Sequence, residues 1–115
     1  MKRFSILFIS LFLLSFQSSF AQGVFNLSAS SGQLRNNLTW DDYSTPSFTT
    51  DSFFIQIWDG SVFNTLDTQA AGDTTFTHRF LSCDSNYTYR VLAFDRGSSP
   101  DTRVSDTASS TPIDN

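Results

Sequence analysis

Residues 81–93 decide the fold, and they read Leu81-Ser82-Cys83-Asp84-Ser85-Asn86-Tyr87-Thr88-Tyr89-Arg90-Val91-Leu92-Ala93. A turn-rich segment leads into apolar residues at every second position from Tyr87, and residues two apart point to one face of a β-strand. A leucine six residues before the first tyrosine is typical of a tyrosine corner, in which the phenol ties a loop between two sandwich strands to the backbone. We therefore expect the Tyr87 hydroxyl to donate a hydrogen bond to a backbone group around Leu81–Asp84.

Short alternating segments separated by turn residues recur on both sides of this stretch, a pattern typical of a β-sandwich. After Arg3 every acidic residue is Asp and every basic residue is Arg. The absence of the helix formers Glu and Lys there favours strands and turns. The predicted fold class is all-β, a seven-stranded antiparallel β-sandwich. Its strands are expected at residues 24–29, 33–40, 52–58, 62–68, 74–80, 86–95 and 102–110.

The spacing of large apolar residues along these strands resembles that of fibronectin type III domains, which are immunoglobulin-like sandwiches. Leu38-Thr39-Trp40 resembles the family's second-strand signature, and Leu81-x-Cys83-x-x-x-Tyr87 resembles its corner, with Cys83 where the family usually has proline. Asn36 stands where an apolar residue is usual. The resemblance implies a core made of Leu38, Trp40, Phe53, Ile55, Ile57, Phe76, Leu81, Tyr87, Tyr89 and Val91.

Residues 1–21 have the pattern of a secretory signal peptide. Lys2 and Arg3 precede an apolar run at 4–16, and Ser19-Phe20-Ala21 supplies the small residues of a cleavage site. The run is shorter than the roughly 20 residues that span a bilayer, so we expect cleavage after Ala21 and no membrane span in the mature chain. In style the chain resembles secreted bacterial proteins of the Bacteroidetes type, and we expect a secreted, extracellular or periplasmic protein. Residues 22–111 are the predicted fibronectin type III-like domain, and residues 112–115 a C-terminal tail or the start of a linker.

Charge and motif content narrow the function classes. The formal net charge is −4 and becomes more negative once Lys2 and Arg3 are removed, which argues against nucleic acid and anionic membranes as partners. The chain holds one Cys and one His, so neither an internal disulfide nor a Cys–His nucleophile is expected. Asp41 and Asp42 are the best carboxylate pair, but adjacent side chains point apart. We therefore expect no enzyme and no cofactor.

Most of the aspartates fall in loops that the resemblance places at one end of the sandwich. Clustered carboxylates bind Ca²⁺, yet Asp also favours turns without any ligand, and no EF-hand spacing is present. We assign no metal site from the sequence, and both interpretations of these aspartates stay open. They are Asp41, Asp42, Asp51, Asp67, Asp73, Asp95 and Asp101.

The alternation also predicts which side chains face away from the core. Two neighbouring strands, at 52–58 and 86–95, would carry an apolar strip on their outward face, and such strips often mark contact surfaces. Loop residues or side chains of the strands at 62–68 and 102–110 could instead cover it, and Arg90 could lie over the Trp58 ring as a cation–π pair. We call this set the outer strip: Phe54, Trp58, Arg90, Leu92 and Phe94.

The function expected from these patterns is a secreted, non-catalytic binding or adhesion module. It would contact an unknown protein or carbohydrate through the outer strip. The alternative is a structural spacer domain of a larger extracellular assembly, with no ligand of its own. Fold-level resemblance does not choose between these functions.

Overall fold

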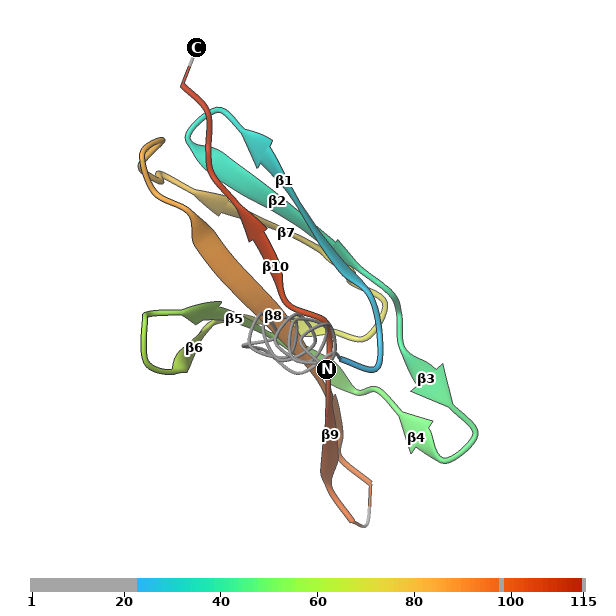
Figure 1. Ribbon diagram of the computed structural model, residues 1–115. Helices are drawn as coiled ribbons and strands as arrows, with labels where there is room; N and C mark the ends of the chain where they lie inside the picture. Colours follow the sequence, from blue (N-terminus) through green and yellow to red (C-terminus); the bar gives the residue numbers. More distant parts are fainter. Residues whose placement is uncertain (1–22, 98, 115) are drawn as a thin grey trace, which may run out of the picture.

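The computed structural model describes residues 23–97 and 99–114, so the predicted signal segment at residues 1–21 lies outside the described residues. Within them the chain forms strands and turns in two main layers (Figure 1). The strands are β1 (Leu27–Gly32), β2 (Arg35–Trp40), β3 (Ser44–Thr45), β4 (Phe48–Thr49), β5 (Ser52–Trp58), β6 (Phe63–Ala70), β7 (Thr75–Arg79), β8 (Tyr87–Asp95), β9 (Asp101–Val104) and β10 (Ala108–Ser110).

The predicted all-β fold with antiparallel sheets is confirmed. One layer is a three-stranded sheet in the order β1-β2-β7, and the other has the order β10-β8-β5-β6, with β9 also paired to β8. Strands β5 and β8 are antiparallel neighbours as expected, with Phe54 directly opposite Leu92. The hairpin predicted at Asp59-Gly60 joins β5 to β6, because Gly60 adopts a positive φ of 102° and the Asp59 carboxylate accepts the Ser61 and Val62 amides.

The core lies between the two main sheets. The ring of Trp40 meets that of Phe53 edge to face at 5.7 Å, which joins the two layers at the centre. Leu81 departs from the prediction. It is only partly buried and lies outside the core cluster of the described residues, because its backbone N–H donates to the Leu34 carbonyl at 2.9 Å and holds it at the rim. Of the other predicted core residues, Leu38, Trp40, Phe53, Ile55, Tyr89 and Val91 are buried, and Ile57, Phe76 and Tyr87 pack against them.

The segment at residues 41–51, expected as a plain loop, contains the short hairpin β3–β4. It contributes a core residue of its own, since Phe48 is buried and its ring lies 5.6 Å from that of Tyr43. The ring of Phe25 also stacks on Tyr43, with the ring centres 5.3 Å apart. Strands of two residues are too short to show an alternating pattern, so no period-two signal predicts this hairpin.

The last predicted strand, at residues 102–110, is broken into β9 and β10 at Ser105. This residue is buried, and its hydroxyl accepts the Val91 amide at 2.8 Å in place of a backbone carbonyl. The N-terminal segment joins at the same point, where Phe25 forms a parallel bridge with Ser105. A side chain that takes over a ladder bond ends regular pairing there.

The chain continues to pack on the sandwich beyond the boundary expected at residue 111. Pro112 is fully buried. Ile113 bridges in parallel to Gln33, with its N–H on the Gly32 carbonyl at 3.0 Å and its own carbonyl accepting the Leu34 amide at 2.8 Å. Residues 112–113 therefore pack on the sandwich, where Ile113 lies beside the β1–β2 turn.

The tyrosine corner is present with the opposite hydrogen-bond direction from the one expected. The Tyr87 hydroxyl accepts the backbone N–H of Ser82 at 3.1 Å instead of donating to a carbonyl. Cys83 and Asp84 replace the family's proline and glycine at this turn, and the Asp84 amide donates to the Ser82 hydroxyl at 3.3 Å. The corner still ties the loop before β8 to the start of that strand.

Removing the Tyr87 oxygen should have a modest effect. Tyr87→Phe leaves the Ser82 N–H without its acceptor, but this bond lies at the surface, so water replaces the phenol. We expect a loss of about 0.5–1.5 kcal/mol in the free energy of unfolding. Urea unfolding measures it, and an unchanged midpoint would mean that the corner bond adds nothing to stability.

Candidate functional site

The outer strip lies on β5 and β8, where its residues alternate with buried ones and are each partly exposed. At one end of the strip the rings of Phe54 and Phe94 lie 5.9 Å apart and tilted by 52°. Leu92 sits opposite Phe54 and next to Val104 of β9. These four side chains form an apolar group across three strands, which we call the aromatic end.

A polar pair divides the strip in its middle. Gln56 lies opposite Arg90, and the Arg90 Nε donates to the Gln56 Oε1 at 2.7 Å. The Gln56 amide then donates to the Thr65 hydroxyl on β6 at 3.1 Å. Partial burial lowers the pKa of Arg90, and the bond to Gln56 compensates part of the desolvation of its guanidinium. The hydrogen-bonded pair of Arg90 and Gln56 therefore divides the outer strip into two apolar parts, the aromatic end and Trp58.

The cation–π contact seen for Arg90 is with Phe63, a residue outside the predicted outer strip. The Arg90 guanidinium lies 4.1 Å from the centre of the Phe63 ring. Phe63 is the Cα partner of Trp58 across the β5–β6 hairpin, and the two rings lie 5.1 Å apart at 56°. Sequence reasoning missed Phe63, although a hairpin at Asp59-Gly60 places the residues on its two sides opposite one another.

A buried polar network lies between the sheets at the opposite end of β8 from Phe94. Asn36 is fully buried, and its Nδ2 donates to the Tyr89 hydroxyl at 3.0 Å and to the Ser110 carbonyl at 3.2 Å. The Tyr89 oxygen also lies 2.8 Å from the His78 Nδ1. In the neutral His78 tautomer that carries its proton on Nε2, the Tyr89 hydroxyl donates to Nδ1 while its oxygen accepts from Asn36. Asn36 thus has a structural role in the slot where an apolar residue is usual.

The same network predicts a pH dependence of stability. Burial lowers the pKa of His78 in the folded chain below its ordinary value of 6.5. At a pH between the folded and the unfolded pKa, His78 is protonated in the unfolded chain and neutral in the folded one. The stability is therefore complete above about pH 6.5 and decreases as the pH falls through this interval. Urea unfolding at about pH 7.5 and about pH 5.5 should show a larger loss for the wild type than for His78→Gln. Equal losses would mean that His78 does not titrate differently in the two states.

Asp41, Asp51, Asp95 and Asp101, four of the seven loop aspartates, have local hydrogen-bond partners. The Asp41 carboxylate accepts the Asn26 amide at 3.2 Å, Asp51 accepts the Arg96 amide, and Asp95 accepts the Thr49 and Gly97 amides. Arg103 donates to Asp101 and lowers the pKa of that carboxyl. In residues 23–97 and 99–114 no three His, Cys, Asp or Glu side chains come together as potential metal ligands. The bonds to Asp41, Asp51 and Asp95 fit the turn-forming interpretation of these residues.

The two packed antiparallel sheets, the buried tryptophan on β2 and the tyrosine corner define a fibronectin type III-like fold, and solved structures agree. An Fn3-like protein from Clostridium thermocellum superposes with a TM-score of 0.54 at 20% identity, over 83% of this chain and 98% of that one. No protein-family model and no curated protein matches the sequence. At this identity the likeness shows the fold alone.

Parts of two carbohydrate-active enzymes have the same fold. A pectate lyase from Pectobacterium carotovorum superposes with a TM-score of 0.59 at 20% identity, over 77% of this chain and 27% of the lyase. A β-1,2-glucanase from Parabacteroides distasonis gives a TM-score of 0.61 at 17% identity, over 85% of this chain and 13% of the glucanase. The chain therefore spans about a quarter of the lyase and about an eighth of the glucanase.

None of the described segments forms a helix of the length and apolar character that crossing a bilayer requires. Cys83 is a free, partly buried thiol beside the corner.

Proposed function

We propose that the chain is a non-catalytic extracellular binding module whose outer strip contacts the surface of a protein. The observation that carries this proposal is the aromatic end, where Phe54, Leu92 and Phe94 gather on the outward face of the five-stranded sheet. Aromatic residues and arginine are enriched at the centres of protein interfaces. Arg90, fixed between Gln56 and Phe63, adds an oriented charge beside them.

The ring geometry favours a protein over a sugar as the partner of this face. The ring pairs are tilted by 52° and 56°, so they offer edges and corners rather than one flat platform. Side chains of a protein can interdigitate with such a relief, whereas a sugar ring stacks best on a single exposed ring face. The competing hypothesis is that the outer strip binds carbohydrate, which a glycan array tests.

Secretion and the lack of catalysis are parts of the same proposal. Residues 1–21 support export, because they combine a basic start, an apolar run and a small-residue cleavage site. Two observations support the absence of catalysis. His78 is bonded to Tyr89 in a structural network, and the Asp41 and Asp95 carboxylates accept hydrogen bonds from backbone amides. Adhesion to a partner outside the cell is the role that fits both.

The alternative is a spacer with no ligand of its own. It is favoured by one observation, the small share of the pectate lyase and of the glucanase that this fold occupies, 27% and 13%. In such enzymes a domain of this size is one part among several. A spacer would still be stable and exported, but changes on the outer strip would alter no interaction.

Binding of the purified protein to protein and glycan arrays tests this proposal. Trp58→Ala combined with Phe94→Ala should weaken the binding of at least one arrayed protein by about 100-fold, the loss typical of two interface anchors. Phe80→Ala removes an exposed aromatic ring from the other sheet and should leave that binding unchanged. Thermal unfolding checks that the double variant is folded.

Three outcomes would contradict the proposal. Glycan binding that the double variant loses would make the outer strip a carbohydrate site. Equal protein binding by wild type and double variant would remove the outer strip from the interaction. An unfolded double variant would mean that these side chains stabilise the sandwich as part of its packing.

A further inference from the structure

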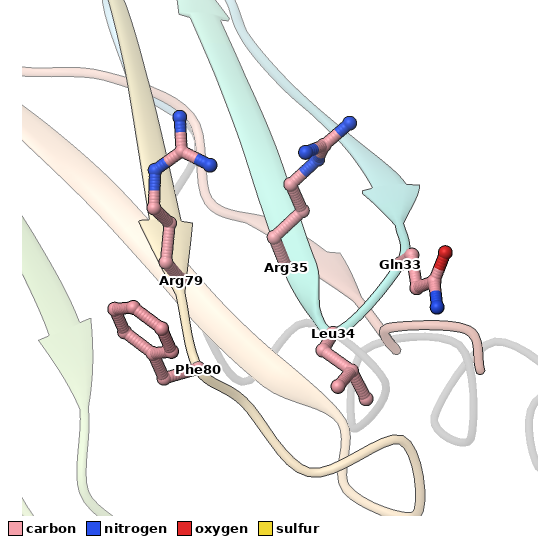
Figure 2. A pocket seen from close by; sticks show the side chains of 5 residues that line it. All are labelled: Gln33, Leu34, Arg35, Arg79 and Phe80. Atoms are coloured by element: carbon pink, nitrogen blue, oxygen red, sulfur yellow. The ribbon is translucent and has the colours of Figure 1, made fainter.

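A shallow cleft of about 350 Å³ lies on the three-stranded sheet, away from the outer strip. It is lined by Gln33 and Leu34 of the β1–β2 turn, Arg35 at the start of β2, Arg79 at the end of β7 and Phe80 just after it. Figure 2 shows the two arginine side chains projecting in the same direction from neighbouring strands, with Phe80 beside Arg79. None of these residues takes part in the core.

The two arginines form a pair of positive charges that nothing described in the chain neutralises. Arg35 and Arg79 are Cα partners across β2 and β7, and adjacent strands lie about 4.8 Å apart. The only ion pair within the described residues joins Arg103 to Asp101. In an acidic chain, two adjacent exposed guanidinium groups repel one another and lack a compensating carboxylate, which makes them a ready site for an anion.

The position of Arg35 depends on a glycine. A Cβ on Gly32 would come within 2.8 Å of the Arg35 Cγ and Nε atoms, so the glycine leaves room for the arginine to lie across the β1–β2 hairpin. Gly32 is the Cα partner of Arg35 in that hairpin. A side chain at position 32 would therefore displace the arginine from this place.

Two apolar residues, Leu34 and Phe80, border the arginines, and both have an unusual backbone conformation. Leu34 has a φ of 52° and Phe80 a φ of 61°, a left-handed region in which glycine or asparagine is usual and bulky residues are rare. Phe80 is 96% exposed, so its ring gains no burial in return. The strain is maintained because the Leu34 backbone bonds to both Leu81 and Ile113. Large apolar groups held outward at such a cost point to a binding role.

Hydrogen-bonding groups continue from the arginine pair along the same face. Asn37 and Thr77 are the next outward partners on β2 and β7, and the Thr77 hydroxyl donates to the Asn37 Oδ1 at 3.1 Å. Asn37 and Thr77 are both partly exposed. The cleft therefore combines a positive pair with an exposed aromatic ring, and a polar row lies next to it on the same face of the sheet.

From this combination we propose that the cleft binds an acidic oligosaccharide, a chain of sugars that carry carboxylates. The planar guanidinium groups of Arg35 and Arg79 would each pair with a carboxylate in two-pronged fashion. The Phe80 ring would stack on the apolar face of a sugar ring, and Asn37 with Thr77 would bond its hydroxyls. Nucleic acid is disfavoured by the negative charge of the rest of the chain. The site is separate from the outer strip and does not depend on its function.

Isothermal titration calorimetry of the purified protein tests this site with a tetramer of galacturonic acid. Neutral tetragalactose and the peptide tetraglutamate are the controls for sugar without charge and charge without sugar. The uronate should bind at least about tenfold more tightly than either, and Arg35→Gln or Arg79→Gln should each weaken it about tenfold. Phe80→Ser should weaken it about fivefold, and raising the salt concentration should weaken it further.

Two control variants separate this site from other effects. Arg96→Gln removes one exposed positive charge from the loop after β8 and should leave uronate affinity within about twofold, since the charge lies outside the cleft. Trp58→Ala with Phe94→Ala should bind the uronate as the wild type does, whether or not the outer strip has a protein partner. All the cleft residues to be changed are exposed, so thermal unfolding should stay unchanged.

Three results would overturn the proposal. The first is no saturable uronate binding at millimolar concentration. The second is equal binding by wild type and by the Arg35→Gln, Arg79→Gln double variant. The third is tetraglutamate binding as tight as uronate binding with the same dependence on both arginines, which would make the cleft a site for acidic peptides.

Discussion

Trp40→Ala is expected to lower the free energy of unfolding by about 3–5 kcal/mol, the cost of a large cavity in a core. Trp40 is 4% exposed and meets Phe53 edge to face at 5.7 Å between the two sheets. A loss of this size is a large part of the stability of a small domain. Urea unfolding followed by circular dichroism measures the change.

Trp58→Ala is the matched control, since it removes the second tryptophan from the outward face of the same sandwich. Trp58 is partly exposed and contacts Phe63, so its removal should cost distinctly less than that of Trp40. A loss below about 1 kcal/mol for Trp40→Ala would mean that the tryptophan does not occupy the centre of the core.

Asn36→Ala is expected to produce the second largest loss, about 2–4 kcal/mol, because it leaves two buried acceptors without a donor. These acceptors are the Tyr89 hydroxyl and the Ser110 carbonyl. Among the described residues the Asn36 Oδ1 itself has no partner, so the contribution comes from the amide nitrogen. The variant is compared with the wild type by urea unfolding at neutral pH.

The neighbouring Asn37→Ala is the control, since this residue faces outward and shares one bond with Thr77. Its loss should stay below about 1 kcal/mol because water can replace that bond. If both variants lost the same free energy of unfolding, the network of Asn36, Tyr89 and His78 would stabilise the fold no more than a surface hydrogen bond does. The network makes a further prediction for the double variant Asn36→Ala, Tyr89→Phe. Its loss should be smaller than the sum of the two single losses, since the two residues share one hydrogen bond.

The regular strands could be predicted from the sequence because alternation is a strong signal in long segments. The segment 52–58 was predicted with the same bounds as β5, and 86–95 differs from β8 by one residue. The same alternation placed Phe54, Leu92 and Phe94 on one outward face. Features that depend on three-dimensional contacts were not predictable in this way.

Three such features were missed for identifiable physical reasons. The β3–β4 hairpin is too short for a pattern, and the break at Ser105 arises from a side-chain hydroxyl that replaces a ladder bond. The packing of Ile113 needs a parallel bridge to the distant residue Gln33. In the candidate site, the polar link between Arg90 and Gln56 and the contact with Phe63 became evident only once register was known.

The two outer faces of the sandwich differ in chemistry. The five-stranded sheet exposes the aromatic end, with Phe54 and Phe94 in contact, whereas the three-stranded sheet carries polar side chains and the pair of Arg35 and Arg79. The two proposals assign these faces to two partners, a protein on the five-stranded sheet and an acidic glycan on the three-stranded sheet.

Nuclear magnetic resonance mapping of the bound surface tests the role of the outer strip most directly. Backbone amide signals of the labelled protein are followed while the array-selected protein partner is added. We predict that the largest shifts lie on β5, β8 and β9, around Phe54, Leu92 and Val104, with little change on β1, β2 and β7. Shifts concentrated on the three-stranded sheet or on the loops would contradict the assignment of the outer strip as the contact surface.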